Sequence, residues 1–194
     1  MIVWLVLCFC LAVIVRIIQL KPPYNGKKLP RKKSPTRHLA VFLGSGGHTS
    51  EALALLSSLN FEKYTSRTYF VSDGDNLSIE RAMALEANKT NAVTHFDIIK
   101  IPRARKVHQS LMTTPSLRKS YPDVLILNGP GTCVMLCIAV YVGRFFMIQT
   151  PIVLYIESFA RVKSLSLSGK LLRPFVDSGK SYLQMADEES ITAG

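Results

Sequence analysis

One segment, AVFLGSGGHTSEAL at residues 40–53, constrains the fold more than any other part of the chain. It begins with an apolar run, Ala40 to Leu43, which is typical of a buried strand. Small residues and a histidine follow, from Gly44 to His48, and then a helical pattern begins. A glycine turn between a strand and a helix lets the backbone approach an anion at the positive end of the helix dipole. The segment therefore predicts a strand, an anion-binding turn and a helix in succession.

The same alternation of apolar strands and helices continues along the chain. Strands are predicted at residues 38–44, 66–72, 95–103, 122–128 and 150–158, and helices at 49–59, 76–87 and 132–143. We expect Thr49 or Ser50 to cap the first helix, and the second helix to start near Asn76 or Ser78. Strands that are apolar throughout are typical of a parallel sheet covered on both faces. We therefore predict an α/β domain with a Rossmann-like parallel sheet over residues 38–177.

Several loops of this sheet are expected to meet at one edge, because ligands of parallel α/β sheets bind beyond the carboxyl ends of the strands. These loops are GSGGHT at residues 44–49, SDGDN at 72–76, NGPGT at 128–132 and ESFAR at 157–161. The candidate site residues in these loops are Gly44, Ser45, Gly46, Gly47, His48, Thr49, Asn128, Gly129, Pro130, Gly131, Thr132, Glu157 and Arg161. The turn at 128–132 is either a second anion-binding turn or a plain connection between strand and helix.

The first glycine loop does not match the common nucleotide-binding patterns. A Walker A loop would continue into Lys-Ser/Thr, and this loop does not. A dinucleotide-binding loop would have a third glycine where Thr49 stands. Asp73, at the end of the second predicted strand, still leaves an NAD-binding protein open as an alternative.

His48 is the residue in this loop that phosphate binding alone does not require. An imidazole that titrates near neutral pH suits a general base. It also suits a simpler role, in which the ring hydrogen-bonds a phosphate or caps the helix. Glu157 and Arg161 likewise fit either a ligand contact or an ordinary helical ion pair. Local chemistry leaves both pairs of alternatives open.

The N-terminal segment, residues 1–20, predicts a single transmembrane anchor. As a helix, residues 2–20 would be about 28 Å long, close to the hydrocarbon thickness of a bilayer. Trp4 and Arg16 lie near its two ends, where aromatic and snorkelling basic side chains meet the interface. A cleaved signal peptide is disfavoured, because no basic residue precedes the apolar run and no small-residue cleavage site follows it.

The net charge of +11 is concentrated just after this segment. Seven basic residues and no acidic ones lie in the linker at residues 21–37, which leaves +4 for the rest of the chain. The basic character therefore does not indicate nucleic-acid binding. By the positive-inside rule, the linker and the domain after it are expected in the cytosol.

A second apolar segment runs from Cys133 to Ile156. We predict a buried helix, a turn and a strand here, because Gly143, Arg144 and Pro151 interrupt the segment. A helix lying on the bilayer surface is the alternative. The cysteines, with no clustered His nearby, indicate neither a disulfide nor a metal site, and we predict no metal.

Four motifs taken in order resemble one family. They are GSGGHT, IPRAR at residues 101–105, PDVLILNGPGTC at 122–133 and YIESFARVKSLSLSGKLL at 155–172. Together they resemble the membrane-anchor subunit of the two-component UDP-N-acetylglucosamine transferase of dolichol-linked oligosaccharide synthesis. GSGGH also resembles the glycine loop of the bacterial peptidoglycan N-acetylglucosaminyltransferase. The family resemblance extends from the anchor to about Asp177.

The resemblance implies the acceptor-side half of a split GT-B glycosyltransferase, inactive alone. A separate soluble catalytic subunit would bind the donor UDP-GlcNAc, and no other cofactor is implied. The pair would add the second GlcNAc to GlcNAc-diphospho-dolichol on the cytosolic face of the endoplasmic reticulum membrane and the contiguous nuclear envelope. His48 would be the base. The turn at residues 44–47 would cradle the acceptor diphosphate or line the cleft beside the donor, and the turn at 128–132 would line the same cleft. Arg103 and Arg105 would either meet the lipid diphosphate at the membrane surface or form only a solvated basic patch.

The C-terminal end departs from the family pattern. The segment at residues 178–194, SGKSYLQMADEESITAG, is polar and acidic, whereas the family continues with an aromatic, Trp-containing segment. We therefore predict a disordered tail, which puts docking of the catalytic subunit in question. A membrane scaffold without catalytic residues stays an alternative function.

Overall fold

The computed structural model describes residues 2–20, 36–89, 95–101, 121–129, 131–158 and 166–180. Its elements in chain order are α1 (Ile2–Gln19), β1 (His38–Leu43), α2 (Gly47–Ser58), β2 (Ser66–Ser72), α3 (Asn76–Lys89), β3 (His95–Ile101), β4 (Val124–Asn128), α4 (Thr132–Phe145), β5 (Ile152–Ile156), α5 (Leu167–Leu172) and β6 (Ser178–Lys180). Of the predicted linker at residues 21–37, residues 21–35 lie outside the described residues.

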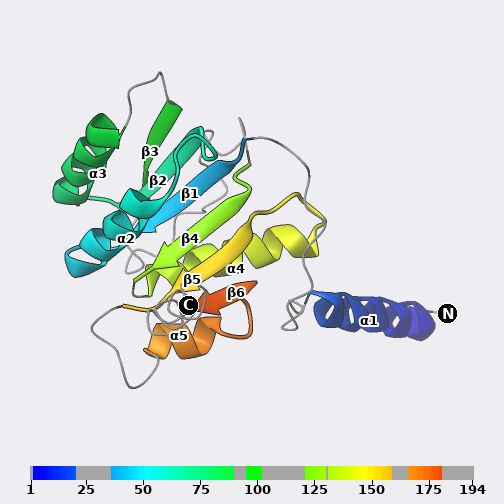
Figure 1. The fold of residues 1–194 in the computed structure, drawn as a ribbon. Helices are drawn as coiled ribbons and strands as arrows, with labels where there is room; N and C mark the ends of the chain where they lie inside the picture. The colour runs from blue at the N-terminus through cyan, green and yellow to red at the C-terminus, as the bar shows by residue number, and fades with distance from the viewer. Residues whose placement is uncertain are drawn as a thin grey trace, which may run out of the picture.

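The strands form one parallel sheet in the order β3-β2-β1-β4-β5-β6 (Figure 1). This is the strand order of the Rossmann fold. Strands β2 and β3 are added on one side of β1, and β4, β5 and β6 are added on its other side. The prediction of a parallel α/β sheet is confirmed. The switch point between β1 and β4 lies where both glycine-rich turns begin.

Helices cover both faces of the sheet, as the apolar strands require. On one face, Leu39 and Val41 of β1 pack in a cluster with Ala52 and Leu56 of α2 and with residues of α3. On the other face, Phe42 of β1 belongs to a cluster that includes residues of α4 and α5. Successive residues of β1 therefore point to opposite faces, and both faces are buried.

The second apolar segment forms a helix, a turn and a strand, as predicted. Cys133 and Cys137 of α4 are buried against the sheet with free thiols. Burial raises the pKa of both thiols, that of Cys137 to about 11, so neither is a thiolate at neutral pH. They are core residues and not nucleophiles.

The start of α2 differs from the prediction, whereas α3 begins at Asn76, as predicted. α2 begins at Gly47, two residues earlier than expected, because Gly46 adopts a positive φ of 70° that ends the turn there. His48 and Thr49 therefore lie inside its first turn. α3 is capped by Asp75, whose carboxylate accepts hydrogen bonds from the amide and hydroxyl of Ser78.

The folded domain extends beyond its predicted end at residue 177. Residues 178–180, expected to begin a disordered tail, form β6 and pair with Leu154–Ile156 of β5. The short helix α5 was also not predicted. The rest of the predicted tail, residues 181–194, lies outside the described residues.

Helix α1 forms as predicted, and it covers neither face of the sheet (Figure 1). Within the described ranges, no helix combines the length and apolarity needed to span a membrane. Arg16 does not extend freely from the end of α1. Its guanidinium donates hydrogen bonds to the carbonyl oxygens of Arg144, at 2.6 Å, and Phe145, at 3.3 Å. A cation at these last carbonyls of α4 is favourable for the helix dipole.

Candidate functional site

The first part of the site is the close contact between the turns after β1 and β4. Gly44 is buried, and a Cβ atom on it would lie 3.0 Å from the carbonyl oxygen of Asn128 and 3.1 Å from Cβ of His48. Gly129 is buried at a φ of 132°, and a Cβ there would meet Cα of Gly44 at 3.5 Å. These two glycines let the backbones of the turns pack together. Their predicted part in ligand binding stays a prediction beside this packing role.

The exposed part of the first turn is open to a ligand. Ser45, Gly46 and Gly47 are exposed, and a Cβ atom on either glycine would meet nothing within 4 Å. They lead directly into the N-terminus of α2, where unpaired amide groups and the helix dipole favour an anion. Gly131 is likewise exposed and open at the start of α4, followed by the half-buried Thr132.

Thr49 has a structural role. It is buried, and its hydroxyl donates a hydrogen bond to the carbonyl oxygen of Gly44 and lies 2.6 Å from the hydroxyl of Ser78. This contact ties the first turn of α3 to the turn after β1. A threonine side chain therefore fills the place where a dinucleotide-binding loop needs a glycine for close helix–strand packing.

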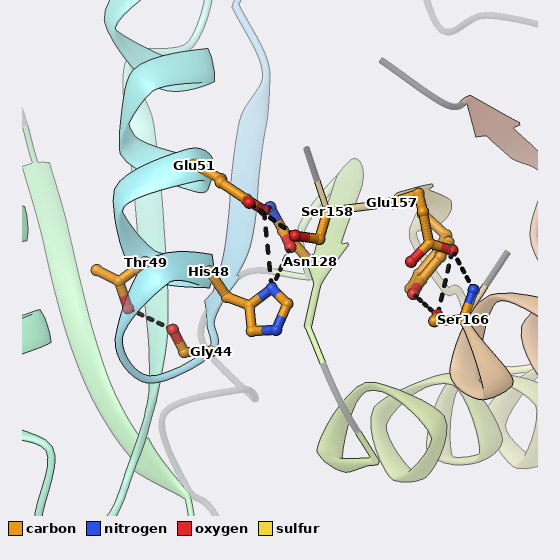
Figure 2. Close-up of polar contacts among 9 residues, drawn as sticks. Gly44, His48, Thr49, Glu51, Asn128, Glu157, Ser158 and Ser166 are labelled. Atoms are coloured by element: carbon orange, nitrogen blue, oxygen red, sulfur yellow. Dashed lines mark hydrogen bonds and ion pairs between the residues drawn. The ribbon is translucent and has the colours of Figure 1, made fainter. Parts of the chain in front are cut away.

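His48 lies between the two turns, and its ring is held from one side (Figure 2). Its side chain is 33% exposed. The ring nitrogen Nδ1 lies 3.2 Å from Oδ1 of the buried Asn128 and 3.7 Å from a carboxylate oxygen of Glu51. The other ring nitrogen points away from both residues in Figure 2. An imidazole held by one nitrogen, with the other turned outward, is arranged to exchange a proton with a ligand.

Glu51 and Ser158 belong to the same cluster, and neither was among the predicted site residues. Ser158 follows β5, and its hydroxyl donates a hydrogen bond of 2.7 Å to Glu51. The amide nitrogen of Asn128 donates to Glu51 over 3.4 Å. The signal for Glu51 is its spacing from His48, because residues three apart on a helix share a face. Ser158 has no signal of its own except its place after a strand.

Glu157 does not join this cluster. Its carboxylate is buried and accepts hydrogen bonds from the amide and the hydroxyl of Ser166, both at 3.1 Å (Figure 2). It also fits against Gly169, where a Cβ atom would lie 2.3 Å from its oxygen. Glu157 therefore holds α5 against the end of β5, and its predicted contact with a ligand stays a prediction.

The remaining predicted residues fall into two groups. Arg103, Arg105, Pro130 and Arg161 lie outside the described residues. Trp4 and Arg16 are on α1, Trp4 being 74% exposed. Within the described ranges, no group of three or more His, Cys, Asp or Glu side chains is placed to hold a metal ion.

The packing role of Gly44 predicts a difference between two glycines of one loop. Gly44→Ala is expected to lower the free energy of unfolding by about 1–3 kcal/mol, because the added methyl group must displace backbone. Gly47→Ala, the control, adds its methyl group to open space at the start of a helix and is expected to change this free energy by less than about 0.5 kcal/mol. Denaturant unfolding measures both. Equal losses would contradict the assignment of Gly44 to packing.

The fold and the site define a class of protein: a Rossmann-like α/β domain whose site lies at the switch point between β1 and β4. Residues 39–118 and 114–188 match the family model described as "Oligosaccharide biosynthesis protein Alg14 like". The chain belongs to the Alg14 family, as its motifs indicated. The match extends past residue 177, so part of the C-terminal segment predicted to be atypical also resembles the family.

Three relatives illustrate the similarity, each named as a UDP-N-acetylglucosamine transferase subunit ALG14. The protein of Cryptococcus neoformans is 41% identical over 90% of this chain and 87% of its own length. That of Schizosaccharomyces pombe is 44% identical over 86% of this chain and 85% of its own. The human protein is 36% identical over 69% of each chain. No solved structure matches the chain.

Proposed function

We propose that this chain is the acceptor-side subunit of a UDP-GlcNAc transferase. With a soluble donor-binding subunit, it adds the second GlcNAc to GlcNAc-diphospho-dolichol. The family supports this, since its members named above are transferase subunits, and a subunit implies a partner. UDP-GlcNAc is bound mainly by that partner. The sheet of this chain is the acceptor-side half of a GT-B enzyme divided between two chains.

The observation that carries the proposal is the position of His48 between two ligand-accessible turns. In an inverting transfer, the acceptor sugar hydroxyl attacks the anomeric carbon of GlcNAc. The proton of that hydroxyl passes to Nε2 of His48 as the new C–O bond forms. The bond from the anomeric carbon to the UDP oxygen breaks, and UDP leaves. The exposed amides at Ser45–Gly47 and the positive end of α2 suit the acceptor diphosphate.

The lipid acceptor requires that the chain stay at a membrane, and α1 has the surface for this. Its side chains Leu7, Leu11 and Ile14 are 53–62% exposed, which is unusual for large apolar residues in water. Phe146 and Met147 are 64% and 81% exposed and lie just beyond the carbonyl groups that Arg16 binds. We assign α1 as the membrane anchor, with the domain on the cytosolic face of the endoplasmic reticulum.

The anchor assignment predicts a change in membrane attachment. Leu11→Glu combined with Ile14→Glu is expected to move most of the chain from the membrane pellet to the soluble fraction. A charged side chain in the middle of a membrane helix costs about 2.5–3.5 kcal/mol. Leu77→Glu changes a residue of α3 that is 54% exposed, and it serves as the matched control. Retention of the double variant in carbonate-washed membranes would contradict the assignment.

Reconstitution tests the function itself. The full chain, the soluble subunit, UDP-GlcNAc and a GlcNAc-diphospho-lipid in vesicles are expected to yield the two-sugar lipid, and either protein alone is expected to yield none. Absence of product, when a well-behaved family member gives it under the same conditions, would refute the proposal. Unchanged product formation by a complex carrying His48→Ala would favour a scaffold without catalytic residues.

A further inference from the structure

Within the described residues, the Glu51 side chain contacts three other polar side chains of the site, those of Ser158, Asn128 and His48. Its Oε1 accepts a hydrogen bond of 2.7 Å from Ser158, and its Oε2 accepts from the amide nitrogen of Asn128 at 3.4 Å and lies 3.7 Å from Nδ1 of His48. These partners come from the carboxyl ends of β5 and β4 and from α2 itself (Figure 2). The side chain is only 14% exposed. One carboxylate of α2 thus connects this helix to the ends of two strands, β4 and β5.

The chemistry of these groups determines which atom of His48 bears the proton. A carboxylate only accepts hydrogen bonds, so the Asn128 side chain must turn its NH₂ group toward Glu51. Its carbonyl oxygen then faces Nδ1 of His48, at 3.2 Å. Both groups near Nδ1 are acceptors, so the proton of the neutral ring resides on Nδ1. Nε2 is left with its lone pair.

We propose that Glu51 is a positioning residue for His48. It sets the orientation of the Asn128 amide, the amide selects the Nδ1-protonated form of the ring, and Nε2 is thereby kept ready to accept a proton. The proposal rests on the proposed function, in which Nε2 of His48 takes the proton of the acceptor hydroxyl. When the ring becomes positively charged in that step, the nearby carboxylate also stabilises the charge, as the carboxylate of a Ser-His-Asp triad does.

The same contacts make a specific rescue possible. Glu51→Gln keeps the shape of the side chain and an oxygen that accepts from Ser158, but it removes the negative charge. The side chain at position 51 then no longer requires Asn128 to present its NH₂ group. The amide of Asn128 is then free to rotate. In Glu51→Gln combined with Asn128→Asp, the new amide at position 51 donates to the new carboxylate at position 128. That carboxylate in turn accepts from Nδ1 of His48, so the donor and acceptor pattern at the ring is restored.

The first test measures transfer by the complex of the full chain with its soluble subunit. Glu51→Gln is expected to lower kcat by about 10- to 100-fold, a typical effect of losing the orienting partner of an imidazole, with KM for the acceptor lipid little changed. The double variant is expected to regain most of the lost kcat. Glu80→Gln, the same change at an exposed position on α3, is the matched control.

The second test measures directly which ring nitrogen of His48 carries the proton. In the same complex labelled with ¹⁵N-histidine, the His48 signals, identified by their loss in His48→Ala, are expected to show Nδ1 protonated and Nε2 unprotonated at alkaline pH. Glu51→Gln is expected to shift the ring toward the Nε2-protonated form, and the double variant to reverse the shift. An unchanged ring or unchanged kcat in Glu51→Gln would overturn the proposal. A wild-type complex without transfer would refute the proposed function, while the ring signals would still decide the role of Glu51.

Discussion

His48→Ala is expected to lower kcat for GlcNAc transfer by about 10²- to 10⁴-fold, which is the usual contribution of a general base. The ring is a third exposed, and only Nδ1 is hydrogen-bonded within the described residues. Its removal therefore leaves a small gap beside Asn128 and little change in the fold. KM for the acceptor lipid should change much less than kcat, because the hydroxyl proton is transferred only in the transition state.

The matched control for this prediction is His95→Ala. His95 is exposed at the first residue of β3, at the amino edge of the sheet and away from both glycine turns. Its replacement should leave kcat and KM unchanged in the reconstituted complex. A rise in KM without a fall in kcat for His48→Ala would instead indicate that the ring binds a phosphate. That result would support the simpler of the two roles that the sequence left open.

The sequence predicts the strands that are rich in apolar residues, and it misses the elements that depend on their neighbours. β1 and β4 are buried apolar runs that end at glycines, so composition and turn chemistry agree. β6 is only the tripeptide Ser-Gly-Lys, with no apolar pattern, and it is a strand because the edge of β5 offers unpaired hydrogen-bonding groups. α5 has six residues, and it starts where Ser166 is held by Glu157.

The candidate site was predictable where glycine or histidine is chemically conspicuous. His48 and Asn128 were selected, and the structure brings them together at 3.2 Å. The roles of individual residues depend on three-dimensional contacts that no local pattern encodes. Gly44 packs closely against Asn128 and His48, and the Glu157 carboxylate accepts hydrogen bonds from Ser166. Glu51 is absent from the prediction because its partners are 77 and 107 residues away in the chain.

The amino end of the sheet contains a buried ion pair that is remote from the site. Arg67 and Glu86 are 1% and 2% exposed, and their side chains form two hydrogen bonds, of 2.6 and 2.7 Å. Tyr69 donates a further hydrogen bond of 2.6 Å to the same carboxylate. Burial, and then the Glu86 carboxylate, raise the pKa of Tyr69 far above its usual range, so it stays a donor. The Arg67 guanidinium also lies over the ring of Phe61, 4.2 Å from its centroid.

Glu86→Ala is therefore expected to cause the largest loss of stability among these variants, about 3–5 kcal/mol. The substitution leaves the Arg67 charge buried without a carboxylate, and water cannot replace it at a side chain that is 1% exposed. The expected fall in melting temperature is about 6–20 °C. Thermal and denaturant unfolding of the full chain would measure the effect, with Glu80→Ala on the exposed side of the same helix as control.

Two further results would distinguish the effect of an unpaired Arg67 charge from the effect of a simple cavity at position 86. Arg67→Met combined with Glu86→Leu and Tyr69→Phe removes every member of the polar cluster and is expected to recover most of the lost stability, since apolar groups of similar volume replace buried ion pairs well. Because Arg67 is the second residue of β2, at the opposite edge from His48, transfer per folded complex should be unchanged in all of these variants. A loss below about 1 kcal/mol for Glu86→Ala would mean that Arg67 finds another partner or reaches solvent, and would contradict the argument.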